Sequence, residues 1–170
     1  MMRTHDTLQE WVNAHKAKSL KQLKEVYTED SIFHRTGTKA TMAEDPAQKV
    51  AEFDHATKTQ RSARPSWVMG DEIRAEVTER SALLEAAGIH EARYVGQFII
   101  RGTQIESVQL EPTPETRQAT DQALSQFIEW ASKKRPERLA QVMPGGRLRY
   151  DAKSGRQLLK LLREWRKSTE

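Results

Sequence analysis

The chain has 170 residues, of which 28 are Lys or Arg and 24 are Asp or Glu, and it contains no cysteine. This length is enough for one domain with a single core. No apolar run approaches the about 18 residues that a membrane helix needs, and no apolar segment follows Met1. We therefore expect neither a membrane span nor a secretory signal. The absence of cysteine excludes disulfides, thiolate catalysis and thiolate metal sites, and it predicts a protein of the reducing cytoplasm.

Charge is distributed unevenly along the chain. Residues 118–170 carry twelve Lys and Arg against six Asp and Glu, whereas residues 1–117 carry sixteen against eighteen. A basic tail of this kind can bind nucleic acid. However, no recognition motif or aromatic platform accompanies it, so nucleic-acid binding is the weakest of the functions considered, and a solvated surface explains the charges.

Helices and a short strand are predicted for the first third of the chain. Apolar periodicity predicts a helix over residues 6–16. Ser19 and Gln22 have the spacing of a capping box, which begins a second helix that we expect to run to about Glu29. Residues 31–35 are typical of a short strand. The pair Asp45-Pro46 indicates the start of a third helix, with the aspartate as N-cap.

Strands are predicted for the middle of the chain. Residues 65–69 look extended, and residues 71–80 alternate between apolar and polar side chains, which predicts a half-buried strand with its Ile73, Ala75 and Val77 side inward. One helical turn over residues 81–88 should end at a glycine in the left-handed conformation. In residues 92–113, two runs of β-branched and aromatic residues flank a Gly-Thr turn, which is the signature of a hairpin.

The pattern after Pro112 is helical. Apolar faces over residues 123–131 and 139–143 predict two helices, and a second capping box at Ser154 and Gln157 predicts the start of a third. Amphipathic helices cannot keep an apolar stripe in water unaided. The helices of this tail therefore either pack on the outside of the domain, close a pocket or build a dimer, and the sequence leaves these three alternatives open.

The order helix, helix, short strand, helix, long strands, hairpin resembles the nuclear-transport-factor-2-like fold and, more narrowly, its SnoaL-like branch. Four segments carry the resemblance: residues 19–34, 70–79, 86–89 and 94–111. It implies an α+β cone over residues 1–115, in which a curved antiparallel or mixed sheet wraps around the N-terminal helices. Residues 116–170 would form a helical extension packed on the same domain. Members are commonly dimers through the convex sheet face, so a homodimer through that face or through the C-terminal helices is expected.

Ketosteroid-isomerase-like members of this fold need a tyrosine on the first helix and two aspartates, one on the first strand and one on the hairpin. A gapless overlay places Trp11, Arg35 and Gly96 at these positions. None has the required chemistry, so this mechanism is rejected.

Limonene-epoxide-hydrolase-like members need an Asp, an Arg and an Asp around a water molecule. The overlay places Arg80, Ala82 and Leu110 there, and only the arginine is kept. SnoaL-like cyclases use an acidic residue as the base for a carbon acid, and the sequence does not locate it.

Two side chains are the candidate catalytic groups. His34 is the only histidine on a predicted strand, and histidine exchanges a proton near neutral pH. Glu79 continues the predicted inward face of the strand over residues 71–80, where a carboxylate among apolar groups suits a general acid or base. The alternative for His34 is that it is an edge histidine with an ordinary partner. The alternative for Glu79 is that the strand has already left the pocket before this residue.

Further candidates for the pocket wall or mouth share an aromatic, apolar or cationic side chain, and each could equally be plain packing. They are Trp11, Tyr27, Arg35, Trp67, Tyr94, Phe98, Val108 and Leu110. The histidines show no close ligand spacing and the glycines form no phosphate loop, so no metal and no cofactor are expected.

The leading hypothesis is a SnoaL-like protein whose apolar pocket binds a small hydrophobic molecule, with acid–base catalysis of the isomerase, cyclase or hydrolase type by His34, Glu79 or both. The rival hypothesis is a non-catalytic dimeric module for ligand or protein binding, whose cavity is filled by its own side chains. Because one fold serves many activities, the resemblance does not choose between them.

Overall fold

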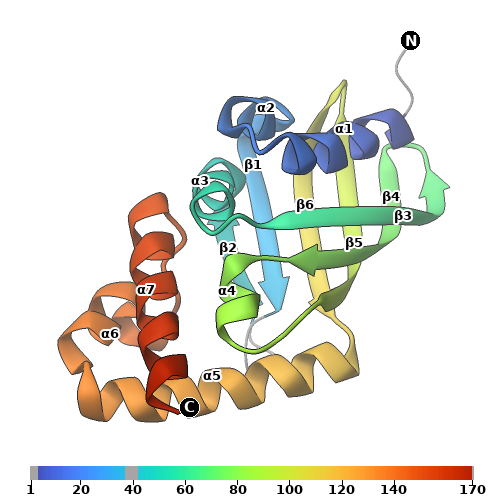
Figure 1. The fold of residues 1–170 in the computed structure, drawn as a ribbon. Helices are drawn as coiled ribbons and strands as arrows, with labels where there is room; N and C mark the ends of the chain where they lie inside the picture. The colour runs from blue at the N-terminus through green and yellow to red at the C-terminus, as the bar shows by residue number, and fades with distance from the viewer. Residues whose placement is uncertain (1–3, 37–41, 170) are drawn as a thin grey trace.

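The computed structural model describes residues 4–36 and 42–169. It has the predicted α+β class, with one six-stranded curved sheet in the strand order β2-β1-β6-β5-β4-β3. Figure 1 shows α1 and α2 across one end of the sheet, α5 running beneath the opposite end, and α7 next to α3 with α6 on the far side of α7.

The N-terminal helices are α1 (Thr4–Ala17) and α2 (Leu20–Glu25). The Ser19 hydroxyl accepts a hydrogen bond from the backbone N–H of Gln22, which confirms the predicted cap. The prediction that this helix reaches about Glu29 is wrong, because β1 (Tyr27–Thr36) already begins at Tyr27. Pairing of Tyr27 with Ile105 of β6 draws the chain into the sheet at that point.

A short strand that was not predicted precedes the third helix. β2 (Met42–Pro46) pairs antiparallel with β1, and α3 (Ala47–Ala56) follows it directly. The expected N-cap at Asp45 is not formed. Asp45 pairs with Phe33 in the sheet instead, and Pro46 occupies the cap position without a side-chain hydrogen bond.

The long strands are β3 (Gln60–Met69), β4 (Glu72–Arg80), β5 (Ala92–Arg101) and β6 (Gln104–Pro112). The β5–β6 hairpin is confirmed, and β3 extends further toward the N-terminus than expected. All neighbouring strands are antiparallel except β1 and β6, which are parallel. The register of β3 shifts between Pro65 and Trp67, where proline offers no N–H to the ladder.

The predicted inward face of β4 is confirmed. Ile73, Ala75 and Val77 are at most 1% exposed, and Glu79 on the same face is 8% exposed. After β4, the helical turn α4 (Ala82–Ala86) ends as predicted at Gly88, which has a φ of +79°.

The C-terminal part consists of α5 (Pro114–Lys134), α6 (Pro136–Val142), the 3₁₀ turn η2 (Pro144–Gly146) and α7 (Ala152–Ser168). The capping box expected at Ser154 is wrong in position, because the side chain of Asp151 caps α7 by accepting from the backbone N–H of Ser154. α7 packs against α3 and α4, so the extension lies on the rest of the fold.

Two apolar clusters stabilise the fold. One lies between the sheet and the helices α1 to α3 and contains Trp11, Phe33 and Phe98. The other joins α3 to the C-terminal helices through Phe53, Phe127 and other side chains. None of the helices within the described ranges is long and apolar enough to cross a membrane.

Candidate functional site

A cavity of about 320 Å³ lies where the sheet, α3 and α4 meet the C-terminal helices. Its apolar wall includes Leu124 and Phe127 of α5 and Leu158 and Leu162 of α7. Its polar end is formed by side chains from β1, β3, β4 and β5. A volume of this size holds a small organic molecule, and an apolar wall with a few convergent polar groups is typical of a ligand site.

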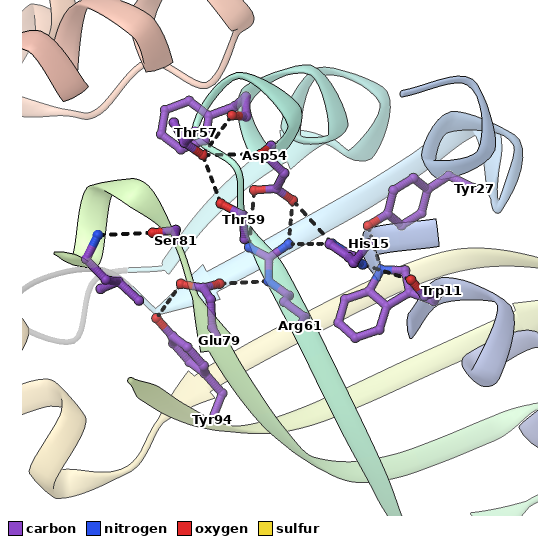
Figure 2. A network of polar contacts seen from close by, with 12 residues as sticks. Trp11, His15, Tyr27, Asp54, Thr57, Thr59, Arg61, Glu79, Ser81 and Tyr94 are labelled. Atoms are coloured by element: carbon purple, nitrogen blue, oxygen red, sulfur yellow. Dashed lines mark hydrogen bonds and ion pairs between the residues drawn. The ribbon is translucent and has the colours of Figure 1, made fainter. Parts of the chain in front are cut away.

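Arg61 of β3 is the centre of the polar end, as Figure 2 shows. Its Nε donates to Oε1 of Glu79 at 2.7 Å, and both terminal nitrogens donate to the carboxylate of Asp54. The side chains of Arg61 and Asp54 are each 1% exposed. Because β3 alternates, Arg61 points inward beside Glu79 of β4, its pairing partner in the sheet.

His15 of α1 completes this cluster. Its Nδ1 lies 2.8 Å from the carbonyl oxygen of Trp11, which can only accept, so Nδ1 carries a proton. Its Nε2 lies 3.3 Å from a terminal nitrogen of Arg61, which can only donate. His15 therefore lies against the guanidinium and helps to hold it in place.

The pKa values of the cluster follow from these contacts. Burial alone would raise the pKa of Asp54, but the charge of Arg61 outweighs this effect and holds the pKa below its usual value. Burial acts against the charge on Arg61, but Asp54 and Glu79 more than offset it and raise the pKa of Arg61. The cluster therefore contains two carboxylates, those of Asp54 and Glu79, paired with the single guanidinium of Arg61.

Glu79 presents the cluster to the cavity. Its Oε1 is held by Arg61, and its Oε2 lies 3.4 Å from the hydroxyl of Tyr94, which donates to it. Burial, and then the charge of Glu79, raise the pKa of Tyr94, so its hydroxyl keeps its proton at neutral pH. The second oxygen of Glu79 is thus the less firmly held of the two, and the residue lines the cavity.

Arg35 is a second cation at the polar end, and its surroundings differ from those of Arg61. Its guanidinium lies over the ring of Tyr150, 4.0 Å from the centroid. Its Nε is buried and has no hydrogen-bond partner. Within the described ranges, no carboxylate oxygen lies within 4 Å of its nitrogens. Burial raises the pKa of Asp45, another lining residue, and the charge of Arg35 offsets only part of this rise.

The structure brings together four of the side chains proposed from the sequence. Glu79, Arg35, Tyr94 and Leu110 all line the cavity. Arg35 faces inward because it lies two residues after Phe33, which is fully buried in the core.

Four other candidates are core residues and do not line the cavity: Trp11, Tyr27, Phe98 and Val108. Each is at most 1% exposed. The indole N–H of Trp11 donates to the hydroxyl of Tyr27 at 2.8 Å, and the ring of Phe98 packs edge-on against Trp11. These contacts fill the space between the N-terminal helices and the sheet, so the hollow is displaced toward the C-terminal helices.

Trp67 also lies away from the cavity. It is 37% exposed near the end of β3, beyond the register shift at Pro65, and Arg74 stacks on its ring with a guanidinium-to-centroid distance of 5.0 Å. The register shift changes which side chains of β3 face the core, and the inward alternation read from Arg61 does not extend to Trp67.

His34 lies on the outer face of the sheet. Its neighbours Phe33 and Arg35 point inward, so alternation turns His34 outward. Its Nδ1 is 3.5 Å from Oε1 of Glu44, and it is not among the cavity-lining residues. The expected position of His34 at the pocket is therefore corrected, and Glu79 is the remaining catalytic candidate.

Sequence reasoning missed Arg61, Asp54, His15 and Tyr150. The apolar face of residues 6–16 includes His15. If the strand over residues 65–69 were extended back to residue 61, alternation would place Arg61 and Ala63 on the same inward face. These patterns locate single buried polar groups. They do not show that the groups meet.

The positions rejected in the overlays remain unsuited to chemistry. At Gly96, a Cβ atom would lie 2.8 Å from Cε2 of Phe98 and 2.9 Å from Cγ2 of Val77, so no aspartate fits there. Arg80 is exposed and pairs with Glu91. Yet a carboxylate–guanidinium–carboxylate arrangement exists, formed by Asp54, Arg61 and Glu79 rather than by the overlay positions.

Within residues 4–36 and 42–169, no three His, Asp or Glu side chains are grouped so that they could hold a metal ion. The guanidinium of Arg61 occupies the space between the two carboxylates, where a cation would otherwise sit.

Solved structures share this fold. An NTF2-like protein of unknown function from Cytophaga hutchinsonii superposes with a TM-score of 0.54 at 12% identity, covering 68% of this chain and 94% of its own. IdmH of Streptomyces antibioticus, a proposed polyketide cyclase, gives a TM-score of 0.53 at 17% identity and coverages of 73% and 99%. An LEH-like epoxide hydrolase of M. tuberculosis gives 0.52 at 10% identity and coverages of 74% and 95%.

No protein-family model and no curated protein sequence matches the chain. At these identities the structural likeness establishes the fold, which is nuclear-transport-factor-2-like as the sequence predicted. The cluster around Arg61 and the placement of Arg35 are observations on this chain's own residues.

Proposed function

We propose that the protein binds a small, mostly apolar molecule in the cavity and acts on it by acid–base catalysis through Glu79. One observation carries this proposal. The carboxylate of Glu79 lines a largely apolar cavity, with one oxygen held by Arg61 and the other next to the hydroxyl of Tyr94. A positioned carboxylate in such surroundings is a general base.

The chemistry follows from the two oxygens of Glu79. Oε2 takes a proton from a carbon acid or from a water molecule, while Arg61 keeps Oε1 in place through its Nε. The electron pair released from the C–H bond moves onto the neighbouring carbonyl oxygen of the substrate, or the deprotonated water attacks the substrate. The protonated Glu79 then returns its proton to the product, so the enzyme ends unchanged.

Structural neighbours support an activity of this class without choosing a reaction. Their names include a proposed polyketide cyclase and an epoxide hydrolase. Because this fold hosts several chemistries, the fold alone does not imply catalysis, and Glu79 together with the cavity supports it.

A non-catalytic homodimeric binding module is the second candidate, and the outer face of the sheet favours it. On this face, Trp67, Met69 and Val95 are large apolar side chains that are 37–66% exposed. A second copy of the chain would cover such side chains if it docked on this convex face. In that case the cavity would hold a ligand without converting it.

Proton exchange on 2-tetralone, a neutral bicyclic ketone with acidic C–H bonds next to its carbonyl, separates the two candidates. In D₂O, NMR would follow loss of the C1 proton signal. We expect the wild type to accelerate exchange and Glu79→Gln to lose about 100-fold or more of that acceleration. Glu76→Gln is the matched control, because Glu76 lies on the same strand but points outward.

Binding of the neutral fluorophore N-phenyl-1-naphthylamine tests the cavity itself. Leu124→Trp, which fills the apolar wall, should weaken binding at least tenfold, whereas Val95→Trp on the exposed outer face should not. Binding without exchange would reject catalysis and leave the binding module. A Leu124→Trp variant that binds the fluorophore like the wild type would reject the cavity as the ligand site.

A further inference from the structure

We propose that Arg35 anchors a carboxylate group of the ligand, so that the molecule bound in the cavity is a small apolar carboxylic acid. This inference rests on the proposed ligand-binding cavity and deepens it by naming the ligand class. It does not depend on whether Glu79 is catalytic.

The two arginines of the polar end differ in the partners that surround them. Arg61 has its nitrogens saturated by Asp54, Glu79 and His15. Arg35, which lines the same cavity, forms no ion pair within the described part of the chain, and its Nε has no hydrogen-bond partner although it is buried. A buried cation is normally paired, so a site that keeps one unpaired has room for a partner that the chain does not supply.

Two aromatic rings lie close to the guanidinium of Arg35. The guanidinium carbon of Arg35 lies 4.0 Å from the centroid of the Tyr150 ring and 5.5 Å from that of Phe33. Aromatic rings that cover the face of a guanidinium leave its in-plane N–H groups as the available donors. A planar carboxylate pairs with these donors edge to edge, and this is the geometry in which arginine exceeds lysine as an anion ligand.

The wall of the cavity away from Arg35 is apolar. Beyond the polar end, the wall is formed by Leu83, Leu124, Phe127, Leu158 and Leu162. Within the described ranges, the hydroxyl of Tyr150 also makes no hydrogen bond, and this residue lines the cavity beside Arg35. A molecule with one carboxylate and an apolar body satisfies both ends at once.

A competing explanation is that Arg35 balances the second carboxylate of the cluster around Arg61. Its charge does act on Glu79 and Asp54. However, balance by a distant charge requires only the positive charge, which a lysine also supplies, whereas recognition of a planar carboxylate needs the fork of donors. Arg35→Lys therefore distinguishes the two explanations.

The test compares 4-phenylbutanoate with its primary amide, which has the same apolar body and no charge. Each displaces N-phenyl-1-naphthylamine from the purified protein at pH 7.5 and fixed salt. We expect the acid to bind the wild type at least tenfold more tightly than the amide. Arg35→Met should reduce this ratio to twofold or less without changing the affinity for the amide, and Arg35→Lys should keep only a small part of the preference.

The matched control is Arg93→Met, which removes an arginine whose side chain is 72% exposed. It should keep the preference of the wild type for the acid. An amide that binds the wild type as tightly as the acid would overturn the inference without any variant, and so would an Arg35→Met protein that keeps the preference. In both cases the fluorophore still binds, whereas failure of the proposed cavity would abolish binding of all three molecules.

Discussion

The polar end of the cavity is built from the sheet and α3, and charge pairs hold its members in place. The apolar end is built from α5 and α7, and packing alone holds it. At the polar end, Arg61 is bonded to Asp54, Glu79 and His15, so each side chain depends on the others. At the apolar end, Leu124 and Leu162 face the cavity, and neither needs a specific partner.

This difference separates two tasks. Charged groups must be fixed within tenths of an ångström to direct a proton or an anion, and strands that pair with one another provide such rigidity. An apolar wall needs only the correct volume, and helices with exchangeable leucines provide it. We therefore expect the chemistry to reside in the sheet and the choice of ligand shape in residues 114–168.

The largest effect should come from Arg61→Met at the polar end. This change leaves Asp54 and Glu79 as two buried carboxylates without their common cation. We expect the free energy of unfolding to fall by about 3–5 kcal/mol, measured by urea unfolding.

Arg64→Met on the same strand is the control, because the pair Arg64–Glu76 is 82% and 64% exposed. Water screens this pair, so the loss should stay below about 1 kcal/mol. Equal losses in the two variants would mean that the polar end is solvated like the surface, and the comparison between the two ends would fail.

Local sequence patterns located the elements that depend on neighbouring residues. The alternation of β4 gave its inward face and placed Glu79 on it, and the hairpin followed from two β-rich runs around a glycine turn. β2 was missed because its last residues, Asp45-Pro46, have the local chemistry of a helix start. Pairing with β1, which is decided across the chain, overrides that local preference.

The candidate site was only half predictable for the same reason. Glu79 could be found from strand alternation, which is local, whereas Arg35 was only one of several candidates for the pocket mouth. The partnership of Arg61 with Asp54 and His15 joins three elements, and nothing in the sequence indicates that these side chains meet. His34 was misplaced because the predicted strand covers only residues 31–35. Both faces of this short segment carry polar side chains, so the pattern does not show which face is inward.

The second prediction concerns two adjacent leucines of α7, and it tests the apolar end. Leu161 is fully buried, whereas Leu162 is 8% exposed and faces the cavity. Leu161→Ala should lower the free energy of unfolding by about 3 kcal/mol because it opens a new void in a packed cluster. The loss for Leu162→Ala should be about 1 kcal/mol smaller than that for Leu161→Ala, because part of the surface of Leu162 already faces empty space.

Urea unfolding of both variants provides the measurement, and fluorophore binding adds a second one. Leu162→Ala enlarges the cavity, so it should still bind N-phenyl-1-naphthylamine, whereas Leu124→Trp should not. If Leu162→Ala proves as destabilising as Leu161→Ala, the apolar end is packed as tightly as a core, and its proposed tolerance is wrong.

The smallest effect is a pH dependence at Asp54. The folded protein holds the pKa of Asp54 below its usual value, so the carboxylate contributes stability that is complete above the unfolded pKa of about 3.9 and is lost as the pH falls toward the folded value. Asp54→Asn lacks this contribution. The stability difference between wild type and variant should therefore be largest near neutral pH and shrink below about pH 4.

Urea unfolding at pH 7, 5, 4 and 3 measures this difference, which should change by at most about 1.4 kcal/mol per pH unit for one proton. Other carboxylates with lowered pKa values, such as Glu164 and Asp151, titrate in both proteins and cancel in the difference. Glu76→Gln, which removes an exposed carboxylate, should follow the wild type. A constant difference from pH 7 to pH 3 would show that Asp54 gains no charge pairing on folding, and the polar end would then be held by packing like the apolar end.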